Sequence, residues 1–397
     1  MKLTQALKPH ISHDDLTKVA ESANAVVGQA KSNMFAPDKK KKPPMFNKVQ
    51  LGALCSLDQN KVTYHLKKGT LPAGTKETTR VMWSLAEARQ WAQKFRVDFL
   101  REREKTSAVT IAVAIFKGGA AKTSTAAALA QGLSLRGHKV LLVDTDPQGS
   151  LTTLFDYMPN VDVSEEHTAL PICAGDSTSI LDSVRPTYWD GLDIVCAGPV
   201  LYNAEFILPS RQKAEAGFEF WRVLDAGLES ARDVYDVIII DTPPALSYVT
   251  INALIAADGV IMPLPPSALD FASSAQFWNL FTEICSGLFT KSGANKKYYF
   301  LDVLLSKVDK ADIVSSAVRQ WILAAYGKYV IPVEIPKTSI AATASAEFGT
   351  VYDLSSTSAQ AKTLKRAKDA YEQLVDYIEM QLIGIWTNDI EKFDQPA

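Results

Sequence analysis

The sequence predicts an α/β fold with a parallel sheet, preceded by a mainly α-helical winged helix-turn-helix domain and an N-terminal helix. Mostly apolar runs at Thr110–Phe116, Lys139–Asp144 and Tyr235–Asp241 are typical of strands buried on both faces of a parallel sheet. Helix-forming stretches lie between or after them, and this alternation is characteristic of α/β proteins. Residues 1–104 hold 19 of the 42 Lys and Arg but only 10 of the 44 Asp and Glu, so a basic front precedes an acidic body.

Length and composition limit the possibilities further. The 397 residues suffice for several domains, which we place at residues 1–45, 46–104 and 105–397. Hydrophobic content of 47% and charged content of 22% are typical of a soluble globular protein. The sequence has no apolar run of about 18 residues and no signal peptide, so we expect a cytoplasmic location and no membrane partner. Its four scattered cysteines lack metal-ligand spacing, which predicts reduced thiols.

A first helix is expected within residues 12–30. Its apolar residues recur at helical spacing: Leu16, Val19, Ala20, Ala23, Val26, Val27 and Ala30. One short helix cannot bury such a stripe alone, so it packs either on its own domain or on a partner chain, and we favour the partner chain. The segment Asp38–Pro44 contains four adjacent lysines and two prolines, which predict an exposed linker, with DNA phosphate contact as a second interpretation.

Residues 47–95 have the pattern of a helix-turn-helix. A short helix over Val49–Cys55 and a turn precede a second helix over Gln59–Lys68, which Gly69 ends. A small wing over Leu71–Trp83 and an amphipathic helix over Leu85–Phe95 follow. The pieces Ser56–Tyr64, Gly69-Thr-Leu-Pro, Arg80 and Trp83-Ser-Leu-Ala-Glu together resemble the winged helix-turn-helix of MerR-type regulators. Outward-facing polar and basic side chains are the candidate DNA contacts: Gln59, Asn60, Lys61, Thr63, Tyr64, Lys67, Lys68 and Arg80. A small helical packing domain that binds no DNA remains the alternative.

The segment Phe116–Ser124 has the pattern of a phosphate-binding loop between a strand and a helix. Two glycines allow a tight turn whose N–H groups point at one anion, and the following helix adds the positive end of its dipole. Lys122 supplies a cation for the β- and γ-phosphates, and the hydroxyl of Thr123 can bind Mg²⁺. Phe116 and Ala121 stand where the usual pattern has glycine. The alternative is an ordinary glycine-rich turn with a solvated lysine.

Carboxylates follow two of the other predicted strands. Asp144 and Asp146 end one strand, and Asp241 ends another. In an open parallel sheet the loops after the strands line the ligand crevice, so these acids are expected beside the phosphate loop. A carboxylate at such a strand end holds Mg²⁺ through its water shell in nucleotide hydrolases.

Here the sequence resembles the ParA/MinD ATPases. Lys117-Gly118-Gly119-x-x-Lys122-Thr123-Ser124 is similar to their deviant Walker A box, which has an extra lysine before the glycines. Asp144-Thr-Asp146-Pro-Gln-Gly and Asp241-Thr-Pro-Pro are similar to their second and third boxes. Pro263–Pro266 followed by Asp270-Phe, and Ile335-Pro336-Lys337 leading to Phe348-Gly349, extend the similarity. With its N-terminal module, the chain resembles the larger ParA partition ATPases.

This resemblance implies an ATPase that uses ATP and Mg²⁺. Lys122 would grip the phosphates, Asp146 would orient the attacking water, and Lys117 would reach a partner chain's nucleotide across a homodimer interface. Thr123, Asp146 and Asp241 would serve the metal, and Pro336 and Lys337 would lie near the adenine. The implied nucleotide site comprises Lys117, Gly118, Gly119, Ala120, Ala121, Lys122, Thr123, Ser124, Asp144, Asp241, Pro336 and Lys337. Implied partners are non-specific DNA on the nucleoid, an operator of its own operon and a centromere-binding protein of ParB type that stimulates hydrolysis.

Two helical stretches near the end of the chain have different characters. The first is basic, with Lys362, Lys365, Arg366 and Lys368, and is either a solvated helix face or a patch for non-specific DNA. The second, Tyr371–Trp386, has an apolar stripe, and its polar residues include Glu372, Asp376 and Glu379. It lacks Lys and Arg, and membrane-surface helices need a basic polar face, so core packing explains the stripe.

Two other functions remain open at this point. The chain could be chiefly a transcriptional regulator that uses nucleotide only as an allosteric ligand. A redox ATPase similar to the nitrogenase iron proteins would need cysteine thiolates holding a cluster, for which Cys196 is the nearest candidate.

Overall fold

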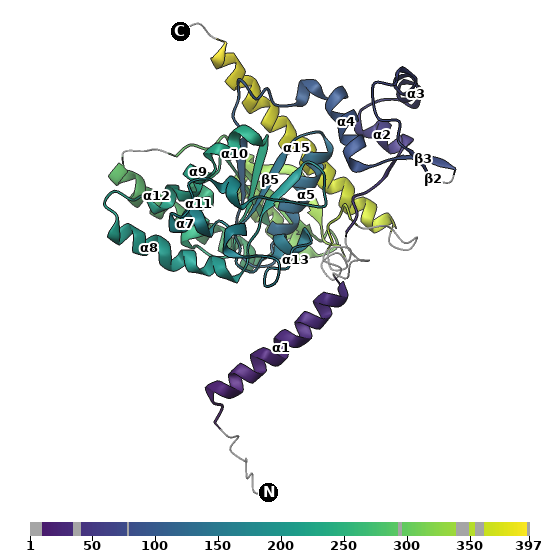
Figure 1. The fold of residues 1–397 in the computed structure, drawn as a ribbon. Coiled ribbons are helices and arrows are strands. Elements are labelled where there is room, and N and C mark those ends of the chain that lie inside the picture. Colours follow the sequence, from purple (N-terminus) through teal and green to yellow (C-terminus); the bar gives the residue numbers. More distant parts are fainter. Residues whose placement is uncertain are drawn as a thin grey trace. The chain divides into compact units, whose positions relative to one another are not determined.

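An eight-stranded sheet forms the centre of the larger part of the chain (Figure 1). The structure is a computed structural model that describes residues 10–34, 41–77, 79–292, 296–338, 349–353 and 361–394. It divides into two units, residues 1–41 and residues 42–397, each of which is described by itself. Residues 38–40 of the predicted linker, and Phe348, lie outside the described residues.

The sheet is mainly parallel, as the sequence predicts. Its order is β11-β10-β9-β4-β8-β5-β7-β6, and only the pair β6–β7 is antiparallel. The strands are β4 (Val109–Val113), β5 (Val140–Asp144), β6 (Arg185–Pro186), β7 (Leu192–Val195), β8 (Val237–Asp241), β9 (Gly259–Leu264), β10 (Phe300–Val308) and β11 (Val330–Pro336). Strand β4 is shorter than the predicted run to Phe116, because the chain leaves the sheet after Val113 to form the loop before α5.

Helices cover both faces of the sheet. They are α5 (Lys122–Leu135), α6 (Ser150–Leu154), α7 (Leu170–Ala174), α8 (Ala204–Ala214), α9 (Val223–Gly227), α10 (Glu229–Val234), α11 (Tyr248–Ala256), α12 (Ala268–Ser292), α13 (Ile313–Tyr326) and α15 (Ala361–Phe393). Short 3₁₀ turns are η2 (Val97–Phe99), η3 (Glu165–His167), η4 (Ile180–Ser183), η5 (Pro199–Asn203), η6 (Phe220–Arg222) and η7 (Gly327–Tyr329).

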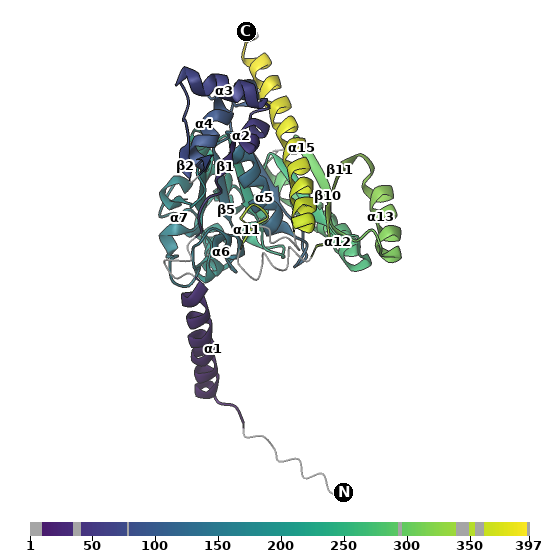
Figure 2. The same cartoon turned by 90° about the vertical axis from the view of Figure 1, so that its right-hand side faces the viewer.

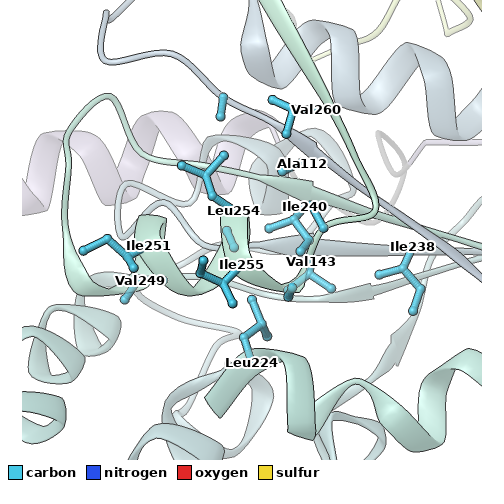
Figure 3. Close-up of a cluster of buried hydrophobic side chains, with 14 of the residues drawn as sticks. Ala112, Val143, Leu224, Ile238, Ile240, Val249, Ile251, Leu254, Ile255 and Val260 are labelled. Carbon is cyan, nitrogen blue, oxygen red and sulfur yellow. The ribbon is translucent and has the colours of Figure 1, made fainter. Parts of the chain in front are cut away.

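Alternate residues of the strands belong to two separate cores. Ala112, Val143 and Ile240 pack with Leu254 and other residues of α11, as Figure 3 shows. Their neighbours along the strands, such as Ile111 and Ile239, face α5 and α15. Figure 2 shows these two helices side by side against the sheet. Since side chains alternate along a strand, this two-layer cover explains why the strands are apolar throughout.

The front of the second unit is a small module with its own core. It contains β1 (Phe46–Asn47), α2 (Lys48–Leu54), α3 (Gln59–Lys68), β2 (Thr75–Glu77), β3 (Arg80–Trp83) and α4 (Leu85–Phe95), and the three strands form one antiparallel sheet. Local signals start and end its helices: the side chain of Asp58 caps α3, and Gly69 ends α3 at φ 67°. Trp83 and Trp91 are buried, and both indole N–H groups donate to the carbonyl of Pro72 at 3.0 Å.

Arg89 of α4 joins this module to the body. Its side chain is only 8% exposed, forms an ion pair with Asp190, and donates to the carbonyls of Ser134 at 2.8 Å and His138 at 2.9 Å. Ser134 lies in the last turn of α5, where a cation is favourable, and His138 follows shortly after the helix ends. Gln93 donates to the neighbouring Gly137 at 3.1 Å. The amphipathic pattern predicts α4, but it does not predict a buried arginine on it.

A second contact between module and body involves Glu379. This residue of α15 is only 4% exposed. It accepts from Arg96 at 2.6 Å and contacts His138 at 2.9 Å. Its partners Arg96 and His138 lie far from it in the sequence, so helical periodicity alone could not show that the carboxylate is paired and buried.

The connection between module and body is also fixed by side-chain contacts. The guanidinium of Arg101 donates to the carbonyls of Thr106, Arg232 and Tyr235. Arg103 forms an ion pair with Asp236 at 3.0 Å. Residues 101–106 are therefore held against the body rather than extending from it.

The first unit contains helix α1 (His13–Met34). Its apolar residues Leu16, Val19 and Val26 are 58%, 66% and 66% exposed. Within the described ranges of the chain, none of the helices combines the length and apolar character needed to cross a membrane.

Candidate functional site

The loop between β4 and α5 has the backbone of an anion cradle. Gly119 and Ala121 both have left-handed conformations, with φ of 76° and 74°, and Lys122 begins the helix. A Cβ on Gly118 or Gly119 would meet no atom within 4 Å. Lys122 is 7% exposed, and its ammonium donates to the carbonyl of Lys117 at 3.0 Å. Burial lowers the pKa of Lys122 against the opposing influence of Asp241 and Asp146.

Phe116 has a packing role that accounts for its departure from the usual glycine. Its ring lies 4.5 Å from that of Phe277 on α12, measured between centroids. Its carbonyl accepts from the hydroxyl of Ser273 at 3.1 Å. Further along the loop, Ser306 of β10 donates to the carbonyl of Ala120 at 3.0 Å. The loop is thus held from α12 and β10, two elements that contribute nothing to the motif itself.

Asp241, the last residue of β8, is buried against the first turn of α5. Strands β5 and β8 are neighbours in register, so Asp144 and Asp241 lie opposite each other. Asp241 is fully buried, and its Oδ2 accepts from the hydroxyl of Thr123 at 2.7 Å. Its other oxygen, Oδ1, has no hydrogen-bond partner among the described residues. Burial, assisted by the nearby Asp146, raises the pKa of Asp241 to about 7, although Thr123 and Lys122 oppose the shift.

Asp144 shapes the loop that follows β5. Its Oδ2 accepts from the backbone N–H of Thr152 at 2.9 Å and from the hydroxyl of Thr152 at 2.8 Å. Its Oδ1 accepts from the N–H of Asp146 at 3.1 Å. Burial and the charge of Asp241 raise the pKa of Asp144 well above its usual range. Its contacts are therefore those of a residue that holds the loop carrying Asp146.

Asp146, Thr123 and Asp241 form an oxygen-rich group beside Lys122. Asp146 is half-buried, and its Oδ1 accepts from the N–H of Gln148 at 3.0 Å. A hydroxyl and a buried carboxylate oxygen without a partner are the hard donors that Mg²⁺ prefers. Magnesium typically takes only one or two protein carboxylates in nucleotide sites and completes its shell with phosphate and water. The residues present therefore fit a magnesium–phosphate site.

Other predicted nucleotide residues lie in two places. Lys117 and Thr123 are half-buried, and Gly118, Gly119 and Ser124 are exposed on the same loop. Pro336 ends β11, Lys337 follows it, and both line a cavity of about 780 Å³. Asp309 also lines it and lies 3.6 Å from the ammonium of Lys337. No motif pointed to Asp309.

The basic residues of α15 lie at this same cavity. Lys362, Lys365 and Arg366 line it, and Arg366 donates to the carbonyl of Lys337 at 3.5 Å. Lys368 instead places its ammonium 5.1 Å from the ring centroid of Tyr352. The structure thus brings together two groups of residues that the sequence suggested for different ligands.

The predicted DNA contacts of the front module lie mainly on the exposed side of α3. Exposed residues are Gln59, Asn60, Lys61, Tyr64, Lys67 and Lys68 on α3, and Arg80 on β3. The ammonium of Lys68 lies 4.6 Å from the ring centroid of Tyr64. Thr63 is half-buried and accepts from Lys48 at 2.5 Å, so its hydroxyl is already engaged. Lys48 was not predicted as part of this surface.

Cys196 does not have the setting of a cluster ligand. It is fully buried, and burial raises the pKa of its thiol to about 12, whereas ligation requires a thiolate. In the part of the chain that the structure describes, no three His, Cys, Asp or Glu side chains are grouped to hold a metal ion. These observations give no support to the redox interpretation.

Comparison with known proteins places this site in a family. The AAA_31 family model, described as an AAA domain, matches residues 108–291. The chain is 31% identical to a putative replication protein A of Sinorhizobium fredii, over 85% of each chain. It is 35% identical to SopA of Escherichia coli over 47% of this chain and 48% of that protein. It is 29% identical to the chromosome partitioning protein ParA of Caulobacter vibrioides, over 65% of this chain and 92% of that one.

Solved structures share the fold. A cobyrinic acid a,c-diamide synthase from Mycobacterium smegmatis with bound ATP analogue and magnesium is 27% identical, with a TM-score of 0.52 over 68% of this chain and 93% of that one. A structure described as a partition protein has a TM-score of 0.65 and covers 94% of this chain and 99% of its own, at 17% identity. The solved structures agree with the fold, and the sequence relatives show that the chain belongs to the ParA-type partition ATPase family.

Proposed function

We propose that this chain is a DNA-partition ATPase that binds ATP with Mg²⁺, dimerises on ATP and hydrolyses it slowly. The observation that carries the proposal is the buried Oδ1 of Asp241. It has no hydrogen-bond partner within the described parts of the chain, and it lies near the Thr123 hydroxyl and the Lys122 ammonium. Burying a carboxylate oxygen without a partner is costly, and a hydrated cation would remove that cost. A related structure holds an ATP analogue and magnesium.

Each residue of the site has one task in this proposal. Lys122 and the N–H groups of the loop bind the phosphates, and Thr123 and Asp241 hold the metal, which neutralises developing negative charge on the phosphates. Asp146 orients the attacking water. Lys117 reaches the nucleotide of a second chain, where its charge stabilises the transition state as an arginine finger does. Pro336 and Lys337 line the cavity that takes the adenine.

DNA binding forms the second half of the proposal. The exposed face of α3, with the hairpin β2–β3 beside it, forms a winged helix-turn-helix that binds an operator, so that the chain represses its own operon. The basic residues at the start of α15 bind non-specific DNA in a salt-dependent manner and keep the protein on the nucleoid. A centromere-binding protein of ParB type stimulates hydrolysis. A relative named as a chromosome partitioning protein supports this role.

The test compares the wild type with Lys122→Ala and Asp146→Ala. We expect wild-type hydrolysis that requires Mg²⁺ and falls on the order of 10²-fold in both variants. We also expect sedimentation of an ATP-dependent dimer on duplex DNA, which ADP does not support. The matched control is Lys392→Ala, since this lysine is 70% exposed and far along the chain from the loop. Hydrolysis unchanged in Lys122→Ala, or DNA binding independent of nucleotide, would refute the proposal.

A second candidate function rests on the docking of the module. Arg89 connects α4 to the C-terminal end of α5, whose first residue is Lys122. Nucleotide bound at one end of α5 could therefore act as an allosteric ligand of a transcriptional regulator. Asp146→Ala separates the two functions. If DNA segregation persists without hydrolysis while operator binding still responds to ATP, the regulator is correct and the partition ATPase is wrong.

A further inference from the structure

One short segment contacts the regions that follow β5 and β8, the two strands that end in acids of the site. It runs from the end of β7 through η5 into α8, residues 197–206. The N–H of Ala197 donates to the hydroxyl of Thr152 at 2.8 Å, and that hydroxyl donates to Asp144 at 2.8 Å. At the other side, Glu205 accepts from the N–H groups of Tyr248 at 3.2 Å and Val249 at 3.4 Å. These N–H groups begin α11, directly after the loop that follows Asp241.

Tyr202 lies in the middle of this segment and contacts the turn that carries Asp146. Its hydroxyl accepts from the side-chain amide of Gln148 at 2.9 Å. The backbone N–H of Gln148 donates to Asp146 Oδ1 at 3.0 Å, and Gly149 closes the turn with an N–H to the carbonyl of Asp146 at 2.8 Å. Gln148 is exposed and Tyr202 is 49% exposed, so the contact lies at the surface.

The turn has little other freedom. Gly149 has φ of 62°, and a Cβ there would approach Pro159 to 2.4 Å and the carbonyl of Ala197 to 2.8 Å. The backbone is therefore confined on the side of Gly149, and Asp144 confines it on the side of Asp146. The side chain of Gln148 is the part that projects outward, and Tyr202 holds it.

We infer that Tyr202 is a positioning residue for hydrolysis: through Gln148 it holds the turn that carries Asp146 in its working geometry. This inference rests on the proposed ATPase function and names a residue that no motif of the sequence indicates. Catalytic groups must be held close to their productive position, and a neutral hydrogen bond that does so has a modest but measurable effect. The hydroxyl of Tyr202 bonds to Gln148 and not to the phosphate loop, so the loss of this hydroxyl should affect turnover rather than ATP binding.

The experiment compares Tyr202→Phe, which removes only the hydroxyl, with the control Tyr299→Phe. Tyr299 directly precedes β10 and is 57% exposed. In the full-length protein we expect kcat to fall about three- to tenfold in Tyr202→Phe, with KM for ATP within about twofold of wild type. Gln148→Ala should give the same fall, and the double variant should fall no further, since both changes break one contact. Losses that add, or a Tyr202→Phe kcat equal to that of Tyr299→Phe, would overturn the inference.

A second measurement does not depend on turnover. With MgADP present, amide hydrogen exchange of residues 145–150 should be faster in Tyr202→Phe than in wild type, while exchange in α5 stays unchanged. If wild type and Tyr299→Phe hydrolyse no ATP, the proposed function fails, and the exchange measurement still decides whether Tyr202 holds the turn. Unchanged exchange in residues 145–150 would refute the positioning role.

Discussion

Replacing Arg89 by alanine should loosen the front module from the body. Arg89 is almost fully buried and donates to the carbonyl of Ser134 in the last turn of α5 at 2.8 Å and to that of His138 just beyond the helix at 2.9 Å. Hydrogen bonds to a charged group contribute about 1.5–3 kcal/mol each. The ion pair with Asp190 contributes less, because Asp190 is 44% exposed and water screens it. Since water can reach part of the vacated space, we expect a loss of about 3 kcal/mol.

The assay is native-state hydrogen exchange of the full-length protein. Because 1.36 kcal/mol corresponds to a factor of ten, a loss of about 3 kcal/mol accelerates exchange in residues 48–95 by on the order of 10²-fold. The matched control is Arg222→Ala, whose side chain is 62% exposed and pairs with Glu219 at 3.4 Å, and this change should alter exchange by less than about threefold.

If Arg89→Ala and Arg222→Ala exchange at similar rates in residues 48–95, the Arg89 contacts do not stabilise the docked module. Arg89→Lys refines the result, since lysine keeps the charge but cannot reach several carbonyls as a planar guanidinium does. We expect it to recover only part of the protection.

Three further predictions concern the site and the sheet. Ala121→Gly removes the strain of a left-handed alanine, which costs about 1–2 kcal/mol, but makes the unfolded chain more flexible, which costs about 0.4–1 kcal/mol. We expect a net gain in the free energy of unfolding of up to about 1.6 kcal/mol, measured by urea denaturation, and a net loss would contradict it. Burial raises the pKa of Asp302 from 3.8 to about 7. Between these pH values the folded chain therefore binds more protons than the unfolded chain, and its stability falls as the pH rises. Asp302→Asn should reduce this fall by about 2–4 kcal/mol when the free energies of unfolding at pH 5 and pH 8 are compared, and an identical pH dependence of both proteins would be inconsistent with the shift. MgATP at 100 times its dissociation constant should stabilise the protein by about 2.7 kcal/mol, measured by thermal unfolding. Either chelation of Mg²⁺ or the substitution Lys122→Ala should remove most of that gain, and a gain that survives chelation would argue against the metal site.

The predicted sheet and phosphate loop could be found from sequence because their signals are local. A buried strand is apolar throughout, and the residues proposed to bind phosphate lie within a few positions of one another. The acids at the ends of β5 and β8 could be placed together because parallel strands present their carboxyl ends at one edge. The left-handed conformation of Ala121 could be suspected, since the usual pattern has glycine there.

Other features depend on contacts between distant parts of the chain. Arg89 and Glu379 occur on amphipathic helices where a charged residue normally faces water, and only their partners from elsewhere make burial tolerable. Tyr202 belongs to a segment without periodicity or motif, so its contact with Gln148 has no signal in the sequence. The cavity shared by Lys337 and Arg366 likewise requires the ends of β11 and α15 to be brought together.

The contacts of Arg101 have a consequence for how DNA would be read. A module on a loose tether can adapt to many arrangements of half-sites, but Arg101 donates to the carbonyls of Arg232 and Tyr235 in the body, and Arg89 of α4 donates to Ser134. If the module binds DNA as proposed, these contacts limit how far it can turn relative to the sheet. If two chains pair through their bodies, the distance between their two α3 helices is then determined by that pairing. The spacing between the half-sites of an operator would then match the distance between the two α3 helices of the dimer. A change of bound nucleotide that altered the pairing of the bodies would also change which half-site spacing the dimer binds.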